Sequence, residues 1–350
     1  MARINPEFTD ELKKYGAFDA NACYNCGNCT AVCTLSDEDN SFPRKMVRYS
    51  VLGLESEILN SLDPWLCYYC GECSTTCPRE ADPGELMMSL RRWLTAKYDW
   101  TGLSGMLYKS ITTSIFAFLA LAILVVWFAV YQNFDPEIIM HYGHYFEILA
   151  ISAVFLLILL PNIVRMWWFT IGKQKIKIPV SAYFKALSEL FVHMFTQKRT
   201  LGCDDNQLRW FEHIILVLGY LLLLFTTVFL NWFSTQYMFI IVIGYIESAV
   251  IFVVTFDFVR RRIVKQAEIS KHSHSSDWFF VIWLLLMGLS AFAVRVFIDL
   301  DIIENNIWLF LVHFIILVQW AAIIVPFGKW THFLYRSFAV YFNRIKEKAV

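Results

Sequence analysis

The sequence has little charge for its length. Charged residues make up 17% of its 350 positions, whereas 57% of them are hydrophobic, with 31 Phe and 13 Trp. A soluble fold of this size could not cover so much apolar surface, so the shortage of charge excludes an ordinary soluble protein and indicates a membrane protein. The same composition excludes a disordered chain, a collagen-like chain and a small secreted module held by disulfides.

Two short signals are also missing. The opening residues, MARINPEFTDELKKYG, contain no basic stretch followed by an apolar run, so no signal peptide is expected ahead of the cysteines. The chain has no G-x-G-x-x-G loop of the kind that binds dinucleotide phosphates. The sequence therefore predicts neither a nucleotide site nor a nucleic-acid partner, and membrane lipid is the first partner it indicates.

The zero net charge hides an asymmetry. Residues 1–105 carry 15 acidic and 10 basic side chains, a net charge of −5, and the rest of the chain carries +5. Eight of the nine cysteines also fall in the first part. The sequence therefore predicts two domains, a polar domain over 1–105 and a membrane domain over 106–350.

The second part contains six apolar runs, each long enough to cross a bilayer as a helix. They cover roughly 110–131, 146–169, 210–233, 237–259, 278–299 and 306–328. The loops 170–209 and 260–277 and the C-terminal tail are rich in Lys and Arg, whereas the loops on the other side carry acidic residues. Since basic loops stay in the cytoplasm, we expect a multi-pass protein of the cytoplasmic membrane with both termini and the cysteine domain on the cytoplasmic side.

One cytoplasmic loop has a pattern of its own. Within 170–209, the segment VSAYFKALSELFVHMF places apolar residues at helical spacing among Lys and Glu. It predicts either an amphipathic helix on the membrane surface or an ordinary cytoplasmic helix.

The cysteines form two runs with the same spacing, C-x2-C-x2-C-x3-C. In such pairs three cysteines bind one cubane cluster and the distant fourth crosses to the other cluster. The spacing predicts two 4Fe–4S clusters, the first bound by Cys23, Cys26, Cys29 and Cys77 and the second by Cys67, Cys70, Cys73 and Cys33. Structural zinc is the alternative, although zinc sites usually use separated CxxC pairs. The ninth cysteine, Cys203, lies alone in a basic loop and is expected to be an idle thiol.

Two histidines near the end of the chain are spaced to serve both membrane surfaces. His313 and His332 are 19 residues apart, about 28 Å along a helix. A six-coordinate b-type haem takes two imidazoles from different helices. His213, at the cytoplasmic end of the third span, is the expected partner of His332, and His144, rather than the weaker candidate His141, is the expected partner of His313. A hydrogen-bonded packing role is the alternative for each histidine, and His272 and His274 are expected to be idle in a solvated loop.

Three further polar residues are candidates for supporting roles. Arg295 lies in the fifth span at a level where it could pair with a haem propionate or extend to the headgroups. Glu247 is near the middle of the fourth span, where a carboxyl is costly unless it is protonated or paired, and it is a candidate for quinol proton transfer. His193, on the predicted loop helix, could compete with His213 or lie near a quinone.

The two halves resemble different redox proteins. The first 105 residues resemble the small C subunits of heterodisulfide reductase, because the insert FPRKMVRYSVLGLESEILN and the following MMSLRRWLTAKY are typical of an α-helical ferredoxin. The segments HFIILVQWAAIIVPFGKWTHFLY and RWFEHIILVLGY resemble the di-haem cytochrome b subunits of nitrate reductase and related complexes. The fusion resembles the C subunits of quinone-modifying oxidoreductase complexes. The chain departs from these relatives at Thr34, where Pro is usual, and at Leu223, where the nitrate reductase protein has a second histidine.

The resemblance implies an all-α protein and a function in electron transfer. It implies two 4Fe–4S clusters, two b haems or one, and menaquinone as substrate, with cytoplasmic heterodisulfide reductase A-like flavin/iron–sulfur subunits as partners and adenylylsulfate reductase downstream in sulfate reduction. The chain has no CCG-type cysteine motif, so it would be a subunit of a quinone oxidoreductase complex with no reduction site of its own beyond quinone. A subunit serving a heterodisulfide or sulfite reductase is the nearest alternative, and a non-redox membrane protein with a zinc domain is a distant one.

Overall fold

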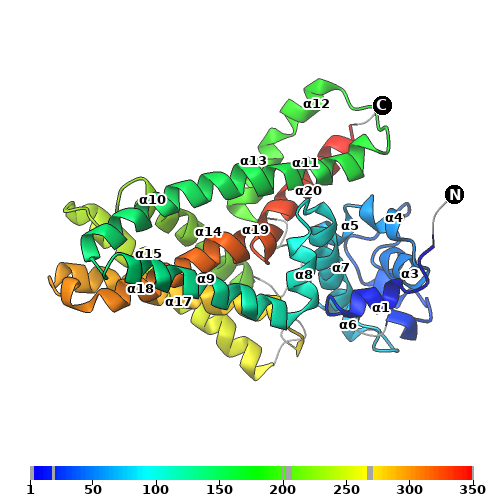
Figure 1. The fold of residues 1–350 in the computed structure, drawn as a ribbon. Helices are drawn as coiled ribbons and strands as arrows, with labels where there is room; N and C mark the ends of the chain where they lie inside the picture. Colours follow the sequence, from blue (N-terminus) through cyan, green and yellow to red (C-terminus); the bar gives the residue numbers. More distant parts are fainter. Residues whose placement is uncertain (1–3, 18–19, 199–200, 202–206, 266–270, 349–350) are drawn as a thin grey trace.

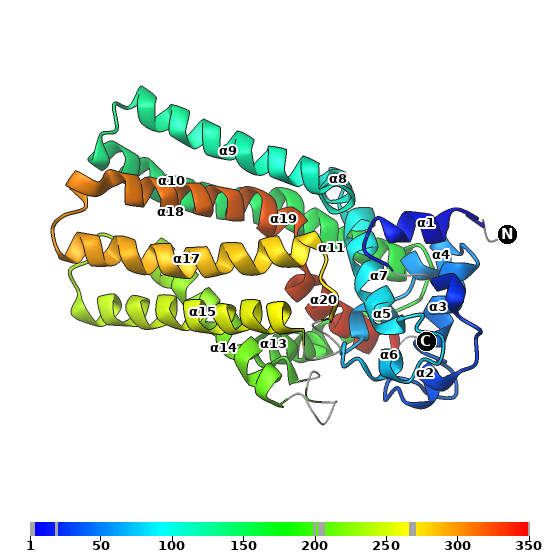
Figure 2. The ribbon, with the colours of Figure 1, turned by 90° about the horizontal axis from the view of Figure 1, so that it is seen from below.

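The computed structural model describes residues 4–17, 20–198, 201, 207–265 and 271–348. Within these ranges every regular element is a helix, so the predicted all-α fold is confirmed. The molecule is elongated, with the N-terminal helices gathered at one end and the long apolar helices extending away from it (Figure 1). Both chain ends lie at the end that holds the cysteine loops (Figures 1 and 2).

The N-terminal region is built from short helices around one long one. They are α1 (Phe8–Lys13), η1 (Ala20–Ala22), α2 (Asn28–Ala31), α3 (Arg44–Val51), α4 (Glu55–Leu59), α5 (Asp63–Leu66), α6 (Glu72–Thr75), α7 (Pro83–Tyr98) and α8 (Leu103–Lys109). Helix α7 starts with Asp82, whose side chain accepts from the Glu85 backbone N–H, and with Pro83 in the first turn. Almost all of α7 is buried, as expected of a helix that other elements enclose on every side.

Six helices are long and apolar enough to cross a membrane, as the sequence predicts. They are Ile111–Tyr131 (α9), Pro136–Gly172, Gln207–Val228 (α14), Met238–Val264 (α15), Ser275–Asp299 (α17) and Glu304–Lys346. The second includes α10 (Pro136–Val154) and α11 (Leu160–Trp167), and the sixth includes α18 (Ile307–Gln319), α19 (Val325–Phe327) and α20 (Thr331–Lys346). Helices α9, α18, α17 and α15 lie side by side (Figure 2). The second helix begins ten residues earlier than predicted and is 37 residues long.

Two of these helices contain wide π-type turns, and in each helix one such turn comes just before a proline. Phe155–Leu159 precedes Pro161, and Trp320–Ile324 precedes Pro326. Proline has no N–H and its ring crowds the carbonyl four residues earlier, so the helix widens there. The Leu157 carbonyl, which Pro161 leaves without a helical donor, accepts a 2.9 Å hydrogen bond from the Trp100 indole. This bond ties the second long helix to the segment that follows α7.

The C-terminal helix is part of the protein core rather than a cytoplasmic tail. The chain leaves the helical path at Gly328, and α20 starts at Thr331 (Figure 2). It packs against α5, α11 and α13 (Leu187–Thr196). Leu334, Tyr335 and Ile345 of α20 belong to the same buried cluster as Trp65 and Trp93 of the N-terminal region. The two predicted domains therefore share one hydrophobic core.

The amphipathic segment of the loop 170–209 forms two helices, α12 (Val180–Lys185) and α13. Leu190 and His193 on the inner face of α13 are buried, whereas Phe191 and Phe195 on its other side are about half exposed. The inner face of α13 therefore packs on protein, mainly on α20.

Candidate cofactor sites

The two cysteine loops have the same backbone conformation. Gly27 and Gly71, at matching positions in the two motifs, both have φ of 93°, a region that disfavours residues with a Cβ. Asn25 and Tyr69, two positions earlier, have φ of 58° and 57°. In each loop the N–H of this residue points at the first cysteine sulfur, at 3.3 Å. The two loops are thus equivalent cradles that surround sulfur with backbone N–H groups, as cluster sites do.

The fold brings the cysteines together across the two motifs. Cys29 interacts electrostatically with Cys23, Cys26 and Cys77. Cys33 interacts with Cys67 and Cys70, and Cys73 interacts with Cys67, Cys70, Cys33 and also Cys29. Cysteines of both motifs therefore lie near one another, as a crossed grouping requires, and the division into two ligand sets stays a prediction.

The thiols in these groups are costly to ionise without a bound cation. Burial raises the pKa of Cys29 and Cys73, and it raises the pKa of Cys33 to about 11. Burial likewise raises the pKa of Cys67, although Arg91 acts against the shift. A coordinating metal reverses this preference because it deprotonates thiols outright. The burial of these sulfurs is therefore consistent with sites that bind a metal cluster.

The two kinds of metal site place their cysteines differently. Across the described ranges, no three Cys, His, Asp or Glu side chains converge closely enough to hold one metal ion. A zinc ion draws four ligands to within about 2.0–2.3 Å of one centre, whereas a cubane spreads its cysteines over four irons. Cys203, the expected idle thiol, lies outside the described residues.

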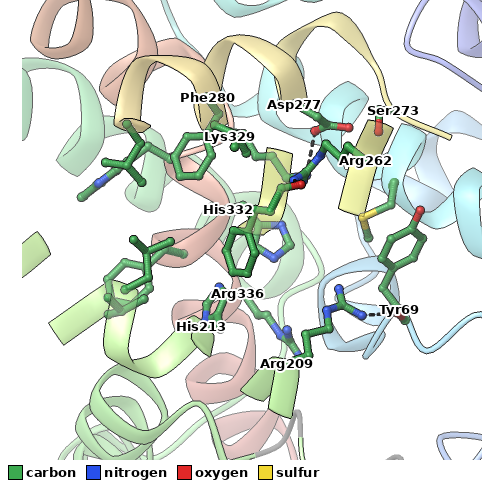
Figure 3. A pocket seen from close by; sticks show the side chains of 18 of the residues that line it. Tyr69, Arg209, His213, Arg262, Ser273, Asp277, Phe280, Lys329, His332 and Arg336 are labelled. Atoms are coloured by element: carbon green, nitrogen blue, oxygen red, sulfur yellow. Dashed lines mark hydrogen bonds and ion pairs between the residues drawn. The ribbon is translucent and has the colours of Figure 1, made fainter. Parts of the chain in front are cut away.

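A cavity of about 260 Å³ lies between the N-terminal region and the long helices. One water takes about 10–15 Å³ on this measure, so the cavity can hold a sizeable organic group. His213 of α14 and His332 of α20 both line it, as predicted for a ligand pair, and Figure 3 shows their imidazoles turned toward the same space. The Nδ1 atom of His213 is buried without a hydrogen-bond partner in the described part of the chain. Such an orphan is costly, and a ligand that orders the imidazole would remove the cost.

The rest of the lining is apolar on one side and cationic on the other. The apolar side consists largely of aromatic and branched side chains, among them Leu216, Tyr220, Phe258, Phe280, Leu284, Trp320 and Trp330. The cations are Arg91, Arg209, Arg261, Arg262, Lys329 and Arg336, whereas Asp277 supplies the one carboxylate among the lining residues. Figure 3 shows Arg209 and Arg336 beside the two histidines. An occupant of this cavity would therefore be an apolar body with anionic groups, and a haem with its two propionates fits that description.

The cavity touches the second cysteine motif directly. Tyr68 and Tyr69, which follow Cys67 in the chain, are among its lining residues. Arg209 donates a 3.0 Å hydrogen bond to the Tyr69 carbonyl, which ties the start of α14 to this loop. By contrast, Cys26 of the first motif is exposed at the surface. The Cys67 group therefore lies on the cavity side and the Cys26 group toward solvent.

Buried charges join the two regions beneath the cavity. Arg92 of α7 contacts Glu85 at 3.0 Å and Asp277 of α17 at 2.9 Å, and Lys329 contacts Asp277 at 2.7 Å. Tyr69 donates a 2.8 Å hydrogen bond to Glu85. Burial raises the pKa of Glu85, although Arg92 opposes the shift, and burial followed by the charge of Glu85 raises the pKa of Tyr69. The network fixes α7 against α17.

Removing the central carboxylate of this network should weaken the joint between the regions. Asp277→Asn keeps a side chain that can cap α17, but it leaves Lys329 without its buried counter-charge and Arg92 with Glu85 alone. We expect a loss of about 3–5 kcal/mol in the free energy of unfolding, measured by thermal unfolding in detergent. Asp257→Asn is the matched control, since its partly exposed pairs with Arg260 and Arg261 are worth about 0–1 kcal/mol. Equal stability of the two variants would contradict the stabilising role of this buried charge network between the two regions.

Two histidines that the sequence analysis treated as idle make contacts between the regions. His272 lines the cavity and lies 3.3 Å from Asp82, the residue that caps α7. His274 caps α17 and packs against Tyr108. Burial lowers the pKa of His274 to about 4, so the imidazole is neutral at neutral pH. The expectation of a solvated loop was wrong because the loop folds back onto the N-terminal region.

The helices that carry the predicted outer pair pack together, since Phe146 of α10 lies against Phe314 of α18, and the pairing of His313 with His144 stays a prediction. His313 is buried, with its Nδ1 2.8 Å from the Ser290 hydroxyl of α17 and its ring against Phe233. His144 lies on α10, 3.8 Å from Glu147 of the same helix, and His141 is exposed beside Tyr145. Neither His313 nor His144 lines a cavity described for the chain. The Ser290 contact leaves Nε2 of His313 as the nitrogen open to a ligand.

Arg295 has a different set of partners from the predicted propionate. Its guanidinium contacts Asp299 at 2.6 Å and donates to the backbone carbonyls of Trp232 and Thr235. These bonds attach the loop after α14 to α17, so Arg295 acts as a structural clamp that holds the loop at the far end of the molecule. Protein acceptors take donors of all three guanidinium nitrogens here, and the propionate role stays a prediction.

The two candidates for quinol chemistry are both buried. Glu247 accepts a 2.9 Å hydrogen bond from Thr226 of α14 on one carboxylate oxygen, and its other oxygen has no partner in the described part of the chain. His193 lies on the inner face of α13, which packs mainly on α20, and it is not among the lining residues of the His213 cavity. The structure therefore places His193 away from that cavity and Glu247 between α14 and α15.

Comparisons with known proteins agree with the site in the N-terminal region. Residues 19–81 match the family described as a 4Fe-4S dicluster domain. The chain is thus an all-α protein with a 4Fe–4S dicluster domain followed by six helices long enough to span a membrane.

The similar proteins are redox proteins of the heterodisulfide reductase kind. The chain is 33% identical over 88 residues to a heterodisulfide reductase C-like protein of Archaeoglobus profundus, a match that covers 25% of this chain and 47% of the relative. It is 32% identical over 99 residues to an iron–sulfur C protein of the CoB–CoM heterodisulfide reductase of Methanocaldococcus jannaschii, covering 26% and 53%. The chain spans about half the length of these curated relatives, and no solved structure matches it. These similarities indicate an electron-transfer domain of the heterodisulfide reductase C kind.

Proposed function

We propose that this chain is the membrane electron-transfer subunit of a quinone oxidoreductase complex. It would pass electrons between the menaquinone pool and cytoplasmic heterodisulfide reductase A-like flavin/iron–sulfur subunits, with adenylylsulfate reductase downstream in sulfate reduction. The protein would span the cytoplasmic membrane six times with both termini in the cytoplasm. The observation that carries the proposal is the cavity that joins His213 and His332 to the loop of the second cysteine motif.

The cavity residues have the chemistry to hold a b-type haem. His213 and His332 supply two imidazoles from different helices, the aromatic side suits the apolar macrocycle, and cations such as Arg209 and Arg336 suit the propionates. When bound, haem supplies a carrier of single electrons. The chain's own contribution is to orient the imidazoles, to exclude water and to set the surrounding charge.

The cysteine groups are arranged so that two clusters could pass electrons from one to the other. We assign one 4Fe–4S cluster to the Cys23, Cys26, Cys29 and Cys77 group and the other to the Cys67, Cys70, Cys73 and Cys33 group. The second group borders the cavity through Tyr68 and Tyr69, while Cys26 is exposed. Electrons would therefore travel between the cavity and the second group, then the first group, then a partner docked at the surface.

The outer half of the membrane region supports a less complete site. His313, oriented by Ser290, is a candidate ligand for a second haem, and His144 of the neighbouring helix α10 is the candidate for its other ligand. Glu247, with one oxygen held by Thr226, is a candidate for taking protons from quinol. One haem per chain is thus the minimum that the proposal requires.

The proposal predicts the cofactor content of the full chain purified in detergent. We expect at least one b haem by pyridine haemochrome and about eight cluster irons with matching sulfide. A menaquinol analogue should reduce the haem and then the clusters. Zinc in the cysteine domain together with no haem absorption would overturn the proposal and leave a non-redox membrane protein with a zinc-binding domain.

A further inference from the structure

Arg91 is the one residue of α7 that touches both the second cysteine motif and a cavity histidine. Its side chain is 4% exposed. The Nε atom donates to the Pro64 carbonyl at 2.6 Å, and Nη2 donates to the Cys67 carbonyl. These bonds hold the backbone that leads into the second motif.

The other side of the guanidinium faces His332. Arg91 Nη1 lies 3.5 Å from Nδ1 and 3.4 Å from Nε2 of that imidazole. One donor cannot make two good hydrogen bonds at these distances, so the contact is mainly that of a charge beside a ring. The Trp65 ring lies 6.0 Å from the His332 ring and 5.9 Å from the Arg91 guanidinium, so all three groups form one packed unit.

The position of this charge has an electrostatic consequence. The guanidinium keeps its positive charge at neutral pH, because arginine is effectively always protonated in proteins. A fixed positive charge in a buried place acts strongly on its neighbours, because little water screens it. It stabilises the state of any nearby redox centre that carries one more electron.

We infer that Arg91 is a positioning residue shared by the two redox sites, which orients His332, holds the Cys67 loop and raises the reduction potentials of both centres. The inference rests on the proposed function, since it takes His332 as a haem ligand and Cys67 as a cluster ligand. Because one charge raises the reduction potentials of both centres together, it changes the difference between the two potentials little. This favours electron exchange between them in either direction. Electrons would then pass between the two centres across the interface that α7 forms.

The test is a redox titration of the full chain in detergent, followed by haem absorbance and by electron paramagnetic resonance of the clusters. In Arg91→Gln we expect the ratio of reduced to oxidised haem at a fixed potential to fall about tenfold, which is about 59 mV for a one-electron couple. The reduction potential of one of the two clusters should shift in the same direction, and that of the other should stay unchanged. Arg91→Lys keeps the charge, so its haem ratio should remain within about twofold of the parent.

Arg165→Gln is the matched control. Arg165 also clamps carbonyls, those of Tyr98 at 2.8 Å and Lys97 at 3.0 Å, but it does not line the cavity. It should leave both potentials unchanged, so any effect of a lost carbonyl clamp on folding is separated from the effect of charge.

The outcomes separate this inference from the proposed function. Arg91→Gln with full haem and iron content and an unchanged haem potential would overturn the role of Arg91 alone, as would an Arg91→Lys potential as low as that of Arg91→Gln. If Arg91→Gln loses its cofactors, Arg91→Lys decides: a tenfold fall in its haem ratio would count against the inference. A parent protein without haem or cluster iron would instead overturn the proposed function itself.

Discussion

His332→Leu should give a protein that keeps its iron–sulfur clusters and loses the haem that we propose lies between α14 and α20. Two partly buried imidazoles line that cavity, and removing one leaves His213 without the partner that a six-coordinate haem needs. We expect haemochrome content to fall by roughly one haem per chain while cluster iron stays near eight. Leucine suits the position because Trp65 already packs beside the imidazole.

The control for this result is His141→Leu. His141 is exposed on α10, outside the cavity, and its loss should leave the haem content unchanged. His213→Leu should repeat the effect of His332→Leu, since the two ligands act on one haem. A low-spin haem spectrum that survives both cavity substitutions would contradict the assignment. His313→Leu then tests whether a second haem is present. A further loss of haem in this variant would place a second haem in the outer half of the membrane region.

Cys67→Ala should remove one cluster and leave the other. We expect about four irons per chain to be lost, with the lost signal belonging to one of two reduced clusters in electron paramagnetic resonance. Cys67 is buried against the shared core, so its loss also opens the interior next to Trp65. The protein should therefore be less stable and should contain one cluster instead of two.

The two matched variants of this experiment are Cys26→Ala and Cys203→Ser. Cys26 is exposed and belongs to the other group, so its loss should remove the other signal with a smaller effect on stability. Cys203→Ser should change neither iron content nor stability. If Cys67→Ala retains about eight irons, or if Cys26→Ala and Cys67→Ala remove the same signal, the crossed assignment of the cysteines is wrong.

Features that depend on nearby residues were determined by the sequence. The six apolar runs became six helices, because about twenty apolar residues form a helix wherever the polar backbone must satisfy itself. The two cysteine motifs took the same backbone conformation, because the same spacing with Gly27 and Gly71 allows the same turn. His213 and His332 could be expected to lie at one level, since both stand at ends of apolar segments, and both line the cavity.

Features that depend on distant residues were decided by the tertiary structure. Arg336 looked like part of a solvated basic tail, yet α20 is amphipathic enough to bury it among α5, α11 and α13. His272 and His274 looked idle because nothing near them in sequence binds them, whereas their contacts are with Asp82 and Tyr108.

The partners of the buried residues Arg91 and Arg295 could likewise not be predicted from the sequence. A lone arginine in a helix carries no local sign of its partners, because a guanidinium reaches whichever acceptors the packing supplies. Packing gave Arg91 the carbonyls of the second cysteine motif and the His332 ring, and it gave Arg295 the loop after α14. The sequence alone thus determined the 4Fe–4S dicluster motifs and the apolar helices, and only the tertiary structure decided which residues connect them, because those contacts span most of the chain's length.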